Sequence, residues 1–249
     1  IANLIVLSPL TAQHDCGSIH TADPQFDAQQ YRAFAKSFND RIYRSPVEVP
    51  VRMHIVTKSN GSNGLEEAEV LEALEDANGM FAGSGIQFVH CGPVHFIADS
   101  RHSDFFTENE DELVNKHNFR DAINIYFFNS IIMEFNLLCG YATFPWMEQD
   151  FIMMANDCTA GGAVLAHELG HYLGLYHTHT RLFGSEHVNA TNCDEAGDLL
   201  CDTPADPGLG YHNVNYNCEY VGFQIDMRGE VYRPDAKNVM SYSRAECRA

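Results

Sequence analysis

Apolar residues recur along the middle of the chain at two spacings, one typical of strands and one typical of helices. Residues 47–59 carry apolar side chains at alternate positions, which predicts a strand. Residues 65–85 repeat apolar positions at helical spacing and stop at glycines, which predicts a helix. Residues 122–131 are apolar almost throughout, a pattern typical of a central strand covered on both faces.

The rest of the chain has a less regular pattern. Residues 86–97 predict one strand or two short ones, and residues 150–157 predict another strand. Residues 140–146, GYATFPW, suggest a loop with a turn at the proline. Residues 163–173 have the apolar spacing of a helix. Beyond them glycine, proline, asparagine, aspartate and cysteine dominate, and little regular structure is expected.

Two segments precede this pattern. Residues 1–13 form a short apolar run that ends in small and polar residues, which is typical of the remnant of a secretory signal peptide; a buried first strand is the alternative. Residues 14–46 are polar and irregular apart from a short helix expected around residues 28–38, and they look like a propeptide or an N-terminal extension. No stretch is apolar over the length that a membrane-spanning helix requires.

Charge and cysteine content narrow the class of protein. The 249 residues include 34 acidic and 15 basic side chains, and the formal net charge of -19 disfavours nucleic acid and anionic membranes as partners. The acidic excess favours sites for hard cations such as calcium, although solubility in a salty medium explains it equally well. Eight cysteines without a CxxC pair indicate disulfides formed in an oxidising compartment, and hence secretion.

The stretch 166–179, AHELGHYLGLYHTH, concentrates groups that bind metals. His167 and His171 lie four residues apart on the predicted helix, so both imidazoles project from one face and suit one tetrahedral zinc. Gly174 permits a sharp turn that returns His177 to the metal as a third ligand. The fourth position stays open for water, which is typical of a catalytic zinc site. Chance is a poor explanation of the whole HExxHxxGxxH pattern.

Glu168 lies about 100° further around the predicted helix than His167, beside the metal rather than on it. Zinc lowers the pKa of a coordinated water to about 7 and polarises a carbonyl oxygen. Glu168 is expected to act as general base toward that water and then to deliver the proton to the leaving amine. These roles predict peptide-bond hydrolysis. His179 is interpreted as a surface residue or as one that supports the metal ligands.

HELGHYLGLYH is the zinc signature of the metzincin clan of metalloproteases, and NVMSY at residues 238–242 resembles the Met-turn of that clan. The resemblance implies that Met240 forms an apolar floor beneath the three histidines, and that Tyr242 stabilises the oxyanion of the tetrahedral intermediate. Within the clan, GDLLCDTPADP at residues 197–207 resembles a loop of the pappalysin family. Similarity to secreted bacterial pappalysin-like proteases extends over residues 47–248.

This resemblance implies an α+β fold, with a twisted mixed sheet, a backing helix and a zinc-binding helix above an irregular, disulfide-linked lower subdomain. The catalytic domain is expected at residues 47–249, divided into an upper subdomain at 47–174 and a lower subdomain at 175–249. A substrate would lie extended in the cleft along an edge strand, for which residues 150–157 are the candidate. Because the chain ends soon after Met240, the C-terminal helix of the family is expected to be missing.

Two further implications concern metal binding. Pappalysins can bind structural calcium near the DTP motif, and the candidate ligands here are the side chains of Asp198 and Thr203 and the carbonyl of Leu200; an acidic, solvated loop is the alternative. Cys16, followed by glycine, resembles the cysteine that blocks zinc in some metzincin zymogens, since a thiolate is a good zinc ligand. A disulfide at Cys16 is an equally good interpretation.

The resemblance also suggests disulfides that hold the lower subdomain together. Its four cysteines allow three connectivities, between which the sequence does not choose. With a third pair around the strand at residues 150–157, the expected disulfides are Cys193–Cys218, Cys201–Cys247 and Cys139–Cys158. If Cys16 binds zinc, one of the other cysteines is free or forms an intermolecular bond.

The sequence as a whole predicts a secreted, monomeric zinc endopeptidase that is made as a latent precursor and acts on peptide or protein substrates. The alternative is a metal-stabilised binding or adhesion module that does not hydrolyse peptides, and the presence of Glu168 beside an open metal position argues against it. A hydrolase of another HExxH clan is disfavoured because His177 supplies the third ligand.

Overall fold

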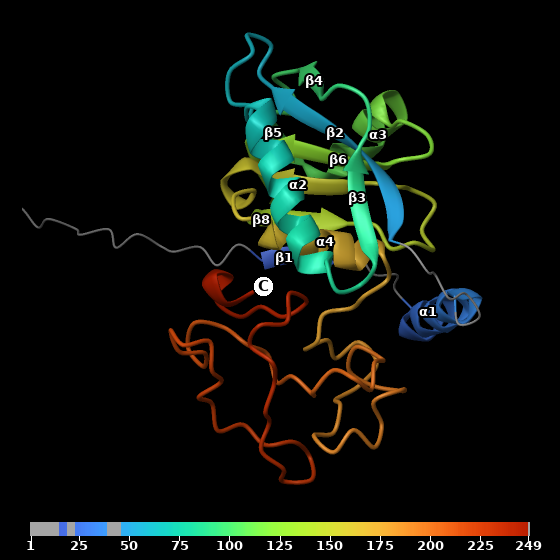
Figure 1. The fold of residues 1–249 in the computed structure, drawn as a ribbon, viewed down its shortest axis with the longest axis vertical. Helices are drawn as coiled ribbons and strands as arrows, with labels where there is room; N and C mark the ends of the chain where they lie inside the picture. Colours follow the sequence, from blue (N-terminus) through green and yellow to red (C-terminus); the bar gives the residue numbers. More distant parts are fainter. Residues whose placement is uncertain (1–14, 19–22, 39–45, 249) are drawn as a thin grey trace, which may run out of the picture.

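The computed structural model describes residues 15–18, 23–38 and 46–248. The run at residues 1–13, interpreted as a signal-peptide remnant, lies outside the described residues. Helices and strands gather in an upper part, and an irregular lobe lies below them (Figure 1). Between Leu173 and Arg244 the chain forms no helix or strand beyond two isolated β-bridges. This arrangement confirms the predicted α+β fold with an irregular lower subdomain.

The upper part of the chain contains nearly all of the strands and helices. The strands are β1 (Asp15–Ser18), β2 (Val47–Thr57), β3 (Ile86–His90), β4 (His95–Ala98), β5 (Asp104–Phe106), β6 (Ile123–Phe128), β7 (Ser130–Met133), β8 (Asn136–Ala142) and β9 (Ile152–Ala155). The helices are α1 (Pro24–Phe38), α2 (Glu67–Phe81), α3 (Glu110–His117) and α4 (Ala163–Tyr172), with short 3-10 helices η1 (Thr107–Asn109), η2 (Asn156–Cys158) and η3 (Ala245–Cys247). The predicted strand at residues 47–59 corresponds to β2, and the predicted helices at 65–85 and 163–173 correspond to α2 and α4.

One nine-stranded sheet forms the upper subdomain, in the order β3-β2-β6-β9-β8-β7-β5, with β4 also paired to β2 and β1 to β8. The pairings of β8 with β7 and with β9 are antiparallel, and the others are parallel. The strand expected at residues 150–157 is β9, which is buried between β6 and β8. Its assignment as the edge strand is therefore wrong. Its apolar sequence reflects a central position.

Residues 140–142 form the end of β8 and not the loop that their sequence suggested. Packing requires the glycine at position 140. A Cβ on Gly140 would stand 2.9 Å from the backbone oxygen of Met153 in the neighbouring strand and 2.9 Å from Oε1 of Glu168. Glycine here thus allows a close approach between a strand and a buried side chain.

Apolar clusters fill both faces of the sheet. On one face, α2 and α4 pack against Ile123, Ile125 and Phe127 of β6. On the other face, Tyr126 and Phe128 of the same strand pack with side chains of α3. Every residue of β6 is buried, which confirms the prediction of a central strand covered on both sides. None of the helices in the described part of the chain is long and apolar enough to cross a membrane.

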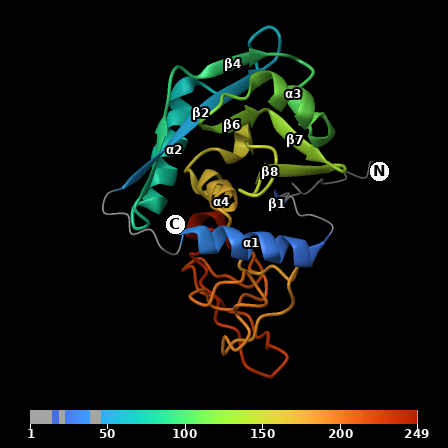
Figure 2. The same cartoon turned by 90° about the vertical axis from the view of Figure 1, so that its right-hand side faces the viewer.

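The helix of the N-terminal extension, α1, lies where the upper and lower subdomains meet (Figure 2). It starts earlier than residue 28 because Asp23 caps it, accepting hydrogen bonds from two backbone N–H groups of the first turn. Its inner face joins an aromatic cluster with residues of both subdomains. The cluster contains Ala28, Tyr31, Phe144, Trp146, Tyr176 and Leu199. Helix α1 is thus packed against the body of the molecule.

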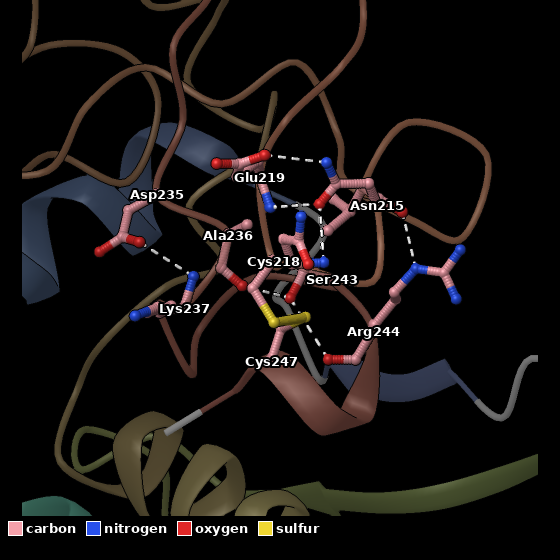
Figure 3. The surroundings of a disulfide bond; sticks show 11 residues. Asn215, Cys218, Glu219, Asp235, Ala236, Lys237, Ser243, Arg244 and Cys247 are labelled. Atoms are coloured by element: carbon pink, nitrogen blue, oxygen red, sulfur yellow. Dashed lines mark hydrogen bonds between the residues drawn. A yellow bond between two sulfur atoms is a disulfide. The ribbon is translucent and has the colours of Figure 1, made fainter.

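Three disulfides join described cysteines: Cys139–Cys158, Cys193–Cys201 and Cys218–Cys247. The first is the expected pair and joins β8 to η2. The expected Cys193–Cys218 and Cys201–Cys247 pairs are wrong. The tight turns of residues 190–201 bring the two Cα atoms of the second bridge within 5.0 Å, and the third bridge fastens η3 to the lower lobe (Figure 3). Cys91 is free.

Candidate active site

Three histidine rings converge at the end of α4. His167 and His171 lie one turn apart on this helix, which ends at Tyr172. Gly174 has a φ of 97°, and the backbone turns there so that His177 returns toward the helix. The three Nε2 atoms lie 3.1, 3.1 and 3.0 Å from one another. Among the described residues, no other group of three His, Cys, Asp or Glu side chains brings its ligand atoms so close together.

Backbone carbonyls set the tautomers of two of these rings. Nδ1 of His167 lies 2.7 Å from the carbonyl oxygen of Val239, and Nδ1 of His171 lies 2.7 Å from that of Leu175. Because a carbonyl only accepts, each Nδ1 carries the proton, which leaves each Nε2 unprotonated. Burial, reinforced by the His171 ring, lowers the pKa of His167 well below its usual value. Three imidazoles with converging Nε2 atoms fit a zinc ion.

Glu168 is completely buried next to these ligands on α4. Its carboxylate packs against Gly140 of β8, where an added Cβ would lie 2.9 Å from Oε1. The strand that passes the carboxylate is therefore β8. This contact links a residue of the zinc signature to the sheet.

The motif at residues 238–242 forms a tight turn beneath α4. Oδ1 of Asn238 accepts a hydrogen bond of 2.9 Å from the backbone N–H of Met240, and its carbonyl oxygen accepts one of 3.1 Å from that of Ser241. Met240 is buried, and a Cβ added to Gly170 of α4 would overlap its sulfur atom. Met240 thus makes an apolar contact directly beneath the ligand-bearing turn of the helix.

Two further aromatic side chains stand beside the ligands. The ring centroid of Tyr242 lies 4.7 Å from that of His177 and 6.0 Å from that of His167. The ring of His179 stacks on that of His177, with centroids 5.1 Å apart and an interplanar angle of 14°. Of the two interpretations of His179, a surface position and support of the ligands, this contact agrees with the second.

An acidic pair is buried beside the DTP motif. Asp198 accepts hydrogen bonds from the Thr203 side chain and, at 3.0 Å, from the backbone N–H of Leu200. Glu186 is 6% exposed, and neither of its carboxylate oxygens has a hydrogen-bond partner among the described residues. Burial and the charge of Asp198 raise the pKa of Glu186 to about 7. Burial also raises the pKa of Asp198 to about 6. No sequence motif singles out Glu186, because only the fold of the lower subdomain brings it to Asp198.

The strand β1 holds the backbone of Cys16 against β8. The two strands pair in parallel, with Cys16 opposite Gly140 and Ser18 opposite Ala142. Since Gly140 contacts Glu168, this register brings the backbone of Cys16 to the part of β8 that adjoins the zinc signature. The side chain of Cys16, the candidate latency ligand, lies outside the described part of the structure.

The chain is similar to known metalloproteases. The family model for Astacin, a peptidase family, matches residues 142–195, which include all three histidines. An extracellular metalloprotease of Colletotrichum graminicola is 26% identical over 233 residues, which cover 85% of this chain and 78% of that protein. Pappalysin-1 of Mus musculus is 29% identical over 179 residues, which cover 61% of this chain and 10% of that protein.

A solved structure also has this fold. It is that of a mutant of promirolysin from Tannerella forsythia, and the two chains match with a TM-score of 0.65 at 17% identity. The match covers 94% of this chain and 88% of that one. Fold, converging histidines and relatives together define a metalloendopeptidase of the metzincin type. Its relatives include proteins named extracellular metalloprotease and Pappalysin-1.

Proposed function

We propose that this metalloendopeptidase is secreted, uses zinc and is held latent by its N-terminal segment. The observation that carries the proposal is the convergence of the Nε2 atoms of His167, His171 and His177 within 3.1 Å of one another. Secretion is supported by three disulfides and by relatives named as extracellular enzymes.

The residues of the site divide the chemistry between them. The three histidines hold the zinc, which when bound polarises the scissile carbonyl and lowers the pKa of a water molecule. Glu168 accepts a proton from the attacking water at a carboxylate oxygen and then donates it to the nitrogen of the leaving amine. Glu168 is completely buried next to the candidate ligands, where it can serve in this role. Tyr242 donates its phenol hydrogen to the developing oxyanion.

A peptide substrate binds extended along β8. Residues 140–142 of β8 pair with β9 on one side and with β1 on the other. A substrate strand in the place of β1 would carry its scissile bond past Glu168, because Gly140 contacts that carboxylate. Substrate and β1 therefore compete for one strand edge.

Latency follows from this competition. Residues 14–46 act as a propeptide whose strand β1 occupies the substrate edge and whose helix α1 packs against both subdomains. Six of the eight cysteines form disulfides with one another, so none of those six is left to pair with Cys16. Cys16 lies opposite Gly140, and its thiolate would serve as a fourth zinc ligand until the propeptide is removed.

A calcium ion in the lower subdomain is a second part of the proposal. Asp198 and Thr203, with the carbonyl of Leu200, are joined by Glu186 as candidate ligands. Two buried carboxyl groups with raised pKa values, one of them without hydrogen-bond partners among the described residues, fit a hard divalent cation. Binding would remove the electrostatic cost of ionising both groups in a buried place.

The test compares single substitutions in the full chain, using hydrolysis of a peptide library and zinc content per chain. Cys16→Ser should raise hydrolysis at least tenfold, whereas the matched control Cys91→Ser should leave it at the level of the parent. Adding Glu168→Gln to the Cys16→Ser chain should lower hydrolysis by about 100-fold or more without loss of zinc. Unchanged hydrolysis after Glu168→Gln or in the presence of a zinc chelator would refute the mechanism. Equal effects of the two serine substitutions would refute the latency role alone.

A further inference from the structure

One aspartate fastens the segment after the zinc signature to the Met-turn. Oδ2 of Asp206 accepts a hydrogen bond of 2.6 Å from the hydroxyl of Thr178 and one of 2.7 Å from the hydroxyl of Ser241. The backbone N–H of Thr178 also donates to the carbonyl oxygen of Met240 over 3.2 Å. Thr178 and Ser241 are buried, and a buried polar group that loses its partner is costly. These bonds therefore hold the segments around Thr178 and Ser241 in a fixed position relative to each other.

The next residue on each segment is aromatic. His179 follows Thr178, Tyr242 follows Ser241, and their ring centroids lie 4.6 Å apart with an interplanar angle of 55°. His179 is at the same time stacked on His177 at 5.1 Å. The Tyr242 ring is thus inclined against a stack of two parallel imidazoles, at 4.7 Å from the first and 4.6 Å from the second.

We infer that His179 is a positioning residue for Tyr242. The inference rests on the proposed function, in which Tyr242 donates to the oxyanion. Both rings of the stack contact the Tyr242 ring, and that of His177 is also a candidate metal ligand. The Thr178–Asp206–Ser241 bonds hold the backbone on both sides of this contact.

The physical reason for the role is the contact between the rings of His179 and Tyr242. Tyr242 is half-buried. An inclined aromatic pair at this centroid separation is attractive and limits rotation of the ring. A donor acts on the oxyanion only while its hydroxyl stays at hydrogen-bonding distance, so loss of the His179 ring should lower the rate of the chemical step. Binding of the substrate backbone along β8 should not change.

The experiment measures kcat and KM on a peptide substrate, with zinc content, in the Cys16→Ser chain. His179→Ala should lower kcat about tenfold and leave KM within about twofold, with unchanged zinc. His179→Phe keeps an aromatic ring of similar shape and should restore kcat to within about threefold of the parent. After Tyr242→Phe, adding His179→Ala should have almost no further effect, because the two residues act as one unit.

Each other result decides against the inference. An unchanged kcat in His179→Ala would exclude a positioning role, and equal losses in the Ala and Phe variants would show that the imidazole nitrogens act and the ring does not. Loss of zinc in His179→Ala would mean that the residue supports His177. Additive effects of the two substitutions would show that His179 does not act through Tyr242. The variant Glu168→Gln distinguishes failure of the proposed function from failure of this inference. Its rate of hydrolysis tests the proposed function independently of His179.

Discussion

The histidines of this site depend on the backbone carbonyls that orient their rings. The carbonyls of Val239 and Leu175 decide which nitrogen His167 and His171 present to a metal. The spacing HExxHxxGxxH predicted the ligands because they lie on one helix and the turn that follows it. It could not predict the Val239 carbonyl, which comes from 72 residues further along the chain and belongs to the backbone. A backbone carbonyl can make this contact whatever the side chain of residue 239 is, so the sequence does not show it.

At the same scale, calcium should stabilise the protein through Glu186. A ligand at 100 times its dissociation constant stabilises a folded protein by about 2.7 kcal/mol, which corresponds to a rise in Tm of roughly 5–10 °C for a chain of this size. Glu186→Gln should lose most of this rise because it removes a buried negative charge. The control Glu195→Gln changes an exposed carboxyl of the same subdomain and should keep it. An equal rise in Tm for the parent and Glu186→Gln, measured by calorimetry, would exclude Glu186 as a ligand.

Among the elements, β8 links the sheet to the zinc signature. It pairs with β9 on one side and with β7 and β1 on the other, and it passes the Glu168 carboxylate at Gly140. The hydrophobic pattern predicted β2, α2, β6, β9 and α4, which are long, buried or regularly amphipathic. It did not predict β8, because a glycine chosen for close packing looks the same in a sequence as a glycine chosen for a turn. It also could not tell an edge strand from a central one, since that depends on which strands pair.

Gly140→Ala should therefore impair catalysis without unfolding the sheet. The added Cβ would lie 2.9 Å from a backbone oxygen of β9 and from the Glu168 carboxylate, so one of the two must move. In the Cys16→Ser chain we expect kcat to fall at least tenfold with zinc retained, because a small displacement of a general base is costly.

The matched control for Gly140→Ala is Gly79→Ala in α2, where an added Cβ meets nothing within 4 Å. It should leave kcat unchanged and raise the free energy of unfolding by about 0.5–1 kcal/mol, as expected for alanine in a helix. An unchanged kcat in Gly140→Ala would contradict the close approach of β8 to Glu168.

The molecule as a whole is held together by contacts between distant segments. The α1 cluster joins the upper subdomain to the lower one, and the Asp206 hydrogen bonds join two distant segments of the lower subdomain. The disulfide pairing of the lower lobe could not be read from the sequence, because each connectivity closes a loop of acceptable length. Polar groups are also buried inside the sheet, notably His54 on β2.

His54 should make the whole protein sensitive to acid. Its Nε2 lies 3.0 Å from Oδ1 of Asn124, its Nδ1 lies 3.0 Å from Nδ1 of His95, and burial lowers its pKa from 6.5 to about 3. Since the folded pKa lies below the unfolded one, the unfolded chain binds more protons between about pH 3 and 6.5. The free energy of unfolding should fall as the pH drops through this window, by up to about 1.4 kcal/mol per pH unit from this group.

Two measurements check this prediction. In a histidine NMR titration, one ring that is absent from His54→Gln should stay neutral down to pH values well below 6.5. Denaturant unfolding at several pH values gives the free energy of unfolding as a function of pH. Between about pH 3 and 6.5 this free energy should change less with pH in His54→Gln than in the control His212→Gln, which changes an exposed ring. A His54 ring that titrates at its ordinary pKa would contradict the prediction.

The central claim is that the Nε2 atoms of His167, His171 and His177 hold one zinc ion next to Glu168. Anomalous diffraction from crystals of the full chain, recorded at the zinc absorption edge, locates such an ion directly. The account predicts one peak at about 2.0–2.1 Å from each of the three Nε2 atoms. A crystal soaked in zinc that shows no peak there, or shows the ion on other residues while the three rings keep their positions, would contradict it.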